Sequence, residues 1–172
     1  MTPTLSRLSW ALSALLFLAL CLVVWIKLGP VLNPEVAAIA RLRGDCNLRV
    51  GPCTAAFPDG GLVTFEISPA HIPAVKELRL KVGTEGIAAH RVEVDFAGVD
   101  MNMGFNRVSL DPAGPGAFVG TAMLPICVRA RMTWEARVLL HTDEGLVAAP
   151  FRFDTYLPGR EPPAGGAPAR SD

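Results

Sequence analysis

The sequence has no excess of either charge and no run of basic residues, since 16 Lys and Arg balance 16 Asp and Glu among 172 residues. Electrostatic binding to nucleic acid needs a basic surface that neutralises phosphates. The composition therefore argues against nucleic acid as a partner.

Motifs typical of enzymes and zinc sites are also missing. The chain has no G-x-S-x-G, no phosphate-binding loop, no C-x-x-C and no H-x-x-x-H. Among the candidate carboxylates, Asp95 falls on the solvated side of an expected strand, Asp111 begins a turn, and Asp100 is suited to fixing its loop. Cys127 has no base near it in the sequence. We therefore predict that the protein is not an enzyme.

The chain has a single long hydrophobic run, in which Ser13 is the only residue of 10–26 outside the hydrophobic set. The lack of a second run approaching ~18 residues excludes a polytopic membrane protein. Extended to residues 10–28, the run is long enough to span a hydrocarbon core of ~30 Å. Trp10 and Trp25 stand at its ends, where indole rings favour the headgroup region. We predict a transmembrane anchor over 10–28 that contacts the lipid bilayer.

Two alternatives to an uncleaved anchor are less consistent with the sequence. A cleaved signal peptide has an apolar core of ~7–15 residues followed closely by small residues. Here the run is longer, and the small residues Ala38-Ile39-Ala40 lie too far downstream. A lipoprotein signal at Cys21 would require a small residue in place of Leu20.

The orientation of the anchor rests on weaker signals. Positive charges near its two ends are nearly balanced, with Arg7 before it and Lys27 after it. The short tail of residues 1–9 and the cysteines described below favour a cytoplasmic N-terminus. We predict a single-pass inner-membrane protein whose C-terminal domain lies in the periplasm.

The remainder divides into a spacer, a domain and a tail. Residues 29–45 form the spacer, in which 34–43 are predicted to be a short helix with Asn33 as its N-cap. Residues 157–172 are rich in Pro, Gly and Ala and are predicted to be disordered.

Residues 46–156 show the period-two alternation that is typical of β-strands. Expected strands are 62–67, 78–82, 92–96, 107–110, 117–124, 134–140 and 146–153. Breakers separate them, among them 58–61, 68–69, 111–116 and the expected hairpin loop 141–145. Short strands at this spacing, each with one charged face, predict an antiparallel β-sandwich. The fold class is therefore all-β, immunoglobulin-like or cupredoxin-like, preceded by one transmembrane helix.

Three cysteines follow the anchor, at Cys46, Cys53 and Cys127. A Gly-Pro pair before Cys53 lets the chain turn back, so a Cys46–Cys53 disulfide is expected in an oxidising periplasm. A bridge from either residue to Cys127 remains open at this point. One exported cysteine is left unpaired in each arrangement.

Apart from Met1, the methionines lie close together, at Met101, Met103, Met123 and Met132. Strand geometry would point Met101 and Met103 to the same side. Soft thioether and thiolate ligands select Cu(I). The functional interpretation is a Cu(I) site made from Met101 and Met103, with Cys127 or a histidine as a further ligand. The alternative is that these methionines fill gaps in the core beside aromatic residues.

The three histidines are scattered through the sequence. His71 falls in a loop between two prolines, His90 opens an expected strand, and His141 closes one. We interpret each as an ordinary surface or strand-end residue.

A pattern of residues over about 60–153 resembles the FixH-like and YtkA-like membrane-anchored extracytoplasmic proteins. The residues that carry it are Asp100-Met101-Asn102-Met103-Gly104, Leu110, Gly116-Ala117-Phe118, Leu124-Pro125 and Trp134. The resemblance implies a role in copper delivery or respiratory oxidase assembly. The three exported cysteines are not part of that pattern, and the C-F-C-F motif of membrane-anchored oxidase copper chaperones is missing.

Two functions are therefore carried forward. The first is a tethered periplasmic domain that binds or hands over Cu(I) to a respiratory or copper-handling membrane protein. The second is an accessory domain without metal, in which residues 101–105 form an apolar loop that docks on a membrane protein complex.

Overall fold

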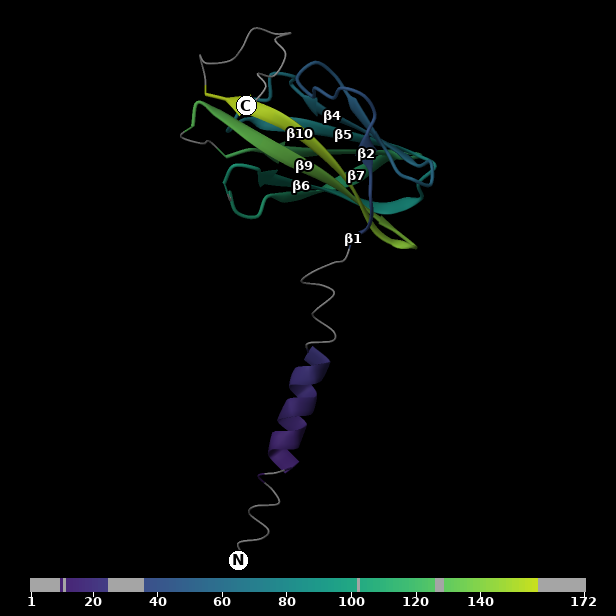
Figure 1. Ribbon diagram of the computed structural model, residues 1–172, viewed down its shortest axis with the longest axis vertical. Helices are drawn as coiled ribbons and strands as arrows, with labels where there is room; N and C mark the ends of the chain where they lie inside the picture. The colour runs from purple at the N-terminus through teal and green to yellow at the C-terminus, as the bar shows by residue number, and fades with distance from the viewer. Residues whose placement is uncertain (1–9, 11, 25–35, 102, 126–128, 158–172) are drawn as a thin grey trace, which may run out of the picture. The chain divides into compact units, whose positions relative to one another are not determined.

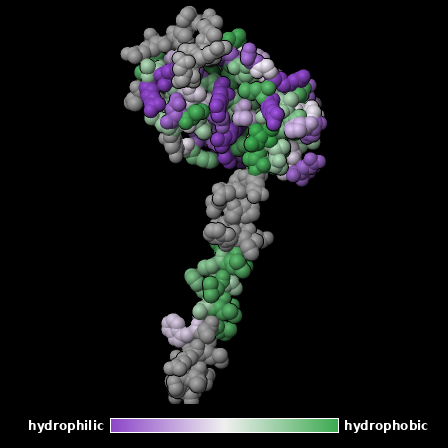
Figure 2. All heavy atoms as spheres, viewed as in Figure 1, coloured by the Kyte–Doolittle hydropathy of each residue, from purple (hydrophilic) through white to green (hydrophobic). Residues whose placement is uncertain are grey.

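A computed structural model describes residue 10 and residues 12–24, 36–101, 103–125 and 129–157. The chain divides into two compact units, Met1–Glu35 and Val36–Asp172. In the first unit, residue 10 and residues 12–24 are helical, and their side chains are exposed and mostly hydrophobic (Figure 2). Within the described parts of the chain, no helix has the length and apolarity needed to cross a membrane. Residues 11 and 25–28 of the predicted anchor lie outside the described residues.

The second unit is built from β-strands (Figure 1). The strands are β1 (Val36–Ile39), β2 (Arg41–Leu42), β3 (Cys53–Ala56), β4 (Leu62–Ser68), β5 (Glu77–Glu85), β6 (Ala89–Gly98), β7 (Arg107–Gly114), β8 (Ala117–Met123), β9 (Arg131–Thr142) and β10 (Gly145–Tyr156). The predicted predominance of β structure is confirmed.

Hydrogen bonds connect the strands in the order β1-β10-β9-β6-β7-β8-β5-β4-β3-β2. All described pairs are antiparallel except β1 with β10, which is parallel. β7 changes partner along its length, because Arg107–Leu110 pair with β6 whereas Asp111–Gly114 pair with β8. We call β1, β10, β9 and β6 layer 1, and β8, β5, β4, β3 and β2 layer 2. β7 joins the two layers in a fold of the sandwich or barrel-like kind.

The core lies between these layers. It follows from the alternation of hydrophobic and polar residues along the strands. In β4, Val63, Phe65 and Ile67 are buried, and the residues between them are only partly buried. The Phe65 ring of layer 2 lies 5.4 Å from the Phe151 ring of layer 1, measured between centroids. Trp134 is fully buried, and its Nε1–H donates to Thr155 Oγ1 at 3.0 Å, so its polar edge is satisfied.

The prediction of a helix over 34–43 is wrong for the described part of that segment. Val36–Ile39 form β1 beside β10, and Arg41–Leu42 form β2 beside β3. The Ala40 N–H donates to the Ala148 carbonyl at 2.8 Å, and Ala40 is buried. Pairing with existing strands outweighs a weak local helix preference. The β unit therefore begins at Val36 and not at the predicted residue 46.

Two expected breakers also differ in the structure. β7 continues through Asp111 and Pro112 to Gly114, with a register shift between Pro112 and Gly114. The register shift marks a bulge, and bulges are among the few places where a sheet accommodates proline. The expected loop 141–145 shrinks to a two-residue turn between Thr142 and Gly145, which pair with each other.

Candidate functional site

One end of the β unit gathers the residues that the sequence singles out. β6 ends at Gly98 and β8 ends at Met123, while β7 begins at Arg107 and β9 begins at Arg131. The loop 99–106 and the segment after Met123 therefore meet at the same end, which we call the methionine end. The Asn106 Nδ2 donates to the Met123 carbonyl at 3.2 Å and links the two segments.

The methionine end is hollowed by an open depression of about 290 Å³. It is lined by Val75, Met103, Phe105, Asn106, Met123, Leu124 and Pro125. Leu124 is fully buried, whereas Phe105 is 81% exposed and Met123 is 53% exposed. The Val75 N–H donates to the Leu124 carbonyl at 2.9 Å and ties the β4–β5 loop to the same depression. Two thioethers thus share one apolar hollow that opens to solvent.

A third methionine lies beside Met103. A Cβ built on Gly98 would come 2.5 Å from Met132 Cε and 3.1 Å from Met103 Cγ. Met132 is 1% exposed and belongs to the core, and Met101 and Met103 pack against that core while partly buried.

The structure modifies the prediction for Met101 and Met103. They lie in a loop and not in a strand, so strand alternation does not fix their directions. Met101 turns its carbonyl oxygen toward Gly98, into the space that a Cβ there would need. Cys127, the third predicted ligand, lies outside the described residues. Among the residues that are described, no group of three or more His, Cys, Asp and Glu side chains could hold a metal ion.

The predicted Cys46–Cys53 disulfide is present, with an S–S distance of 2.08 Å. Its loop buries Leu48 and is held by Arg49, whose Nη1 donates to the His71 carbonyl at 2.9 Å. The Arg49 guanidinium also lies 5.1 Å from the centroid of the Tyr156 ring. The disulfide loop therefore packs near the C-terminal end of β10.

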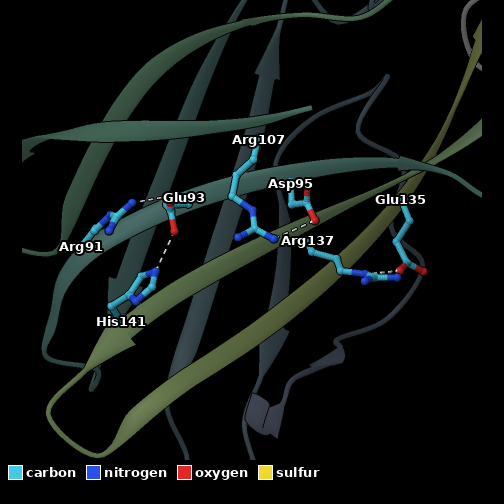
Figure 3. A network of polar contacts seen from close by, with 7 residues as sticks. All are labelled: Arg91, Glu93, Asp95, Arg107, Glu135, Arg137 and His141. Carbon is cyan, nitrogen blue, oxygen red and sulfur yellow. Dashed lines mark hydrogen bonds and ion pairs between the residues drawn. The ribbon is translucent and has the colours of Figure 1, made fainter. Parts of the chain in front are cut away.

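Sequence reasoning did not identify a polar network on the outer face of layer 1 (Figure 3). Glu93 is only 7% exposed, and its Oε1 accepts from Arg91 Nη2 at 2.6 Å. Its Oε2 lies 2.8 Å from His141 Nε2. Burial raises the pKa of Glu93, but the hydrogen bond with His141 and the charge and hydrogen bond of Arg91 outweigh burial and lower that pKa overall.

Further along the same face, Glu135 accepts from Arg137 Nε at 2.8 Å and from Arg152 Nε at 3.0 Å. Burial raises the pKa of Glu135, and these two arginines reverse the shift, so that its pKa is lowered. Asp95 pairs with Arg107 at 3.3 Å and is partly buried, where a fully solvated residue was expected. Figure 2 shows hydrophilic side chains together with hydrophobic ones on this face.

The strand register, which local sequence does not contain, explains the network. Arg91 pairs with His141, and Asp95 pairs with both Arg107 and Arg137. Asp95 thus faces two arginines across neighbouring strands, and Glu93, two residues away on β6, lies on the same face between Arg91 and His141.

Comparison of the chain with family models, with curated proteins and with solved structures gives no match.

Proposed function

We propose that the protein is a single-pass inner-membrane protein whose periplasmic β-sandwich binds Cu(I) and passes it to a respiratory or copper-handling membrane protein. The observation that carries the proposal is that Met103 and Met123, from separate segments, line one open hollow. Thioethers are uncharged soft ligands, so they bind Cu(I) in an apolar setting without burying an anion. Met101 and Cys127 are kept as further candidate ligands.

The proposed setting draws on the rest of the chain. The apolar run 10–28 would be the anchor, and the Cys46–Cys53 disulfide is of the kind that persists in an oxidising compartment. Two layers of mainly antiparallel strands support an immunoglobulin-like or cupredoxin-like sandwich as the finer fold class. The resemblance of residues 60–153 to FixH-like and YtkA-like proteins is what suggests a role in oxidase assembly or copper homeostasis.

The test is an anaerobic Cu(I) titration of the full-length chain in detergent against a competing chromophoric chelator. We expect one Cu(I) per chain with sub-micromolar affinity, and at least a tenfold loss in a Met103→Leu/Met123→Leu variant. Leucine keeps the apolar volume and removes the sulfur. Val119→Ala, on β8 but outside the hollow, is the matched control and should keep full affinity. Binding no tighter than micromolar in the native chain would overturn the proposal.

A second candidate function, docking without metal, is favoured by one observation. Phe105 is 81% exposed, and its ring is held 5.1 Å from the Arg107 guanidinium. An aromatic ring fixed in solvent suits contact with a partner. A photo-crosslinking residue at 105 should then give a discrete adduct in native membranes, whereas the same residue at 119 should give none. Equal labelling from both positions would contradict docking.

A further inference from the structure

Gly98 is the point at which two methionine side chains approach each other. It ends β6, and a Cβ on it would lie 2.5 Å from Met132 Cε and 3.1 Å from Met103 Cγ. Each of these carbon atoms is bonded directly to its own sulfur. The thioether of β9 and the thioether of the loop 99–106 are therefore neighbours, separated by a position that has no side chain.

The approach is fixed by the chain that follows Gly98. The Val99 N–H donates to the Thr133 carbonyl at 3.0 Å, and the Thr133 N–H donates to Asp100 Oδ2 at 3.4 Å. These bonds fasten the start of the loop to β9 immediately after Met132. The carbonyl oxygen of Met101 also occupies the space that a Cβ on residue 98 would need, so the close passage requires glycine.

Met132 and Met123 flank Met103 at different depths. Met132 is 1% exposed and packs in the core, whereas Met123 is 53% exposed on the rim of the hollow that Met103 also lines. The methionines of β9, of the loop 99–106 and of β8 thus range in exposure from buried through partly buried to exposed. Methionine is unbranched, so rotation about its side-chain bonds lets the sulfurs converge.

Resting on the function proposed above, we propose that Met103, Met123 and Met132 are the three thioether ligands of the Cu(I) site, and that Gly98 is a positioning residue that lets Met132 reach the ion. In this site Met132 is the inner ligand and Met123 the outer one. An exposed outer ligand provides the route by which Cu(I) enters and leaves. The lining Leu124, Pro125 and Phe105 supply apolar surroundings that favour Cu(I) over ions that prefer oxygen ligands.

The experiment uses the full-length chain, Cu(I) alone as the probe, and two measurements. X-ray absorption at the copper edge counts the sulfur ligands, and methyl NMR of 13C-labelled methionines follows each thioether. We expect three sulfurs in the native chain and two in Met132→Leu, with at least a tenfold loss of affinity. The Met132 methyl resonance should shift on addition of Cu(I), together with those of Met103 and Met123.

Gly98→Ala provides a second variant that leaves all sulfur atoms in place. We expect it to lose at least tenfold in affinity, while Val119→Ala binds as the native chain does. If the native chain binds Cu(I) but the Met132 resonance and the affinity of Met132→Leu are unchanged, the ligand set is overturned and copper binding stands. If the native chain binds no Cu(I), the proposed function itself is overturned.

Discussion

Glu93 connects Arg91 and His141 within the layer 1 polar network. Its carboxylate is nearly buried and interacts with Arg91 and His141. Changing Glu93 to Gln removes the charge and replaces one acceptor by a donor, which leaves Arg91 without its ion pair. We expect the free energy of unfolding to fall by about 1–3 kcal/mol. Urea denaturation followed by tryptophan fluorescence measures this change.

The control is Glu66→Gln, because Glu66 faces Lys81 at 3.9 Å, with Lys81 well exposed and Glu66 partly exposed. Surface pairs of this kind contribute little, so the change should stay within about 0.5 kcal/mol. Equal losses in the two variants would show that the Glu93 contacts do not stabilise the fold.

The lowered pKa values of Glu93 and Glu135 also predict how stability depends on pH. A carboxyl whose pKa is lower in the folded chain than in the unfolded chain binds fewer protons when folded. Its contribution is therefore full above the ordinary value of about 4.5 and is lost as the pH falls through the folded pKa. We expect the urea concentration at the unfolding midpoint to decrease as the pH is lowered below 4.5. It should decrease less steeply in a Glu93→Gln/Glu135→Gln variant. A parallel decline in both proteins would contradict this assignment.

At the scale of elements, the strands that alternation predicts are those that bury one face, such as β4 and β9. β1 and β2 could not be predicted in this way, because they are short edge strands whose conformation depends on pairing with β10 and β3. For the same reason, the meeting of Met103 with Met132 was not predictable. It depends on the register of β6 against β9, which local sequence does not contain.

The disulfide loop between Cys46 and Cys53 is an element whose contribution can be measured. Closing a loop of this size stabilises a fold by about 2–3 kcal/mol in the chain-entropy description. A Cys46→Ser/Cys53→Ser variant should lose that amount in denaturant unfolding. Cys21→Ser is the matched control, since Cys21 is unbonded and lies outside the β unit. An unchanged unfolding midpoint in the double variant would show that the loop is held by its other contacts, such as those of Arg49.

At the scale of the whole molecule, β1 begins beside Leu146, near the β9–β10 turn, and β10 ends with Tyr156 near the disulfide loop at the opposite end. The chain therefore enters the β unit at the end opposite to the methionine end. Within the β unit, the first residues of β1 and the proposed copper site therefore lie at opposite ends of the strands.

The proposed topology can be tested with alkaline phosphatase fused after Asp172 in a bacterial host. The enzyme is active only where its own disulfides form, so a periplasmic β unit predicts an active fusion. Deleting residues 10–28 from the same fusion should abolish activity, because the chain would then lack its export signal. An inactive full-length fusion that accumulates to normal levels would place the β unit in the cytoplasm. Proteases added outside the inner membrane would then leave the β unit intact, and a periplasmic copper function would be untenable.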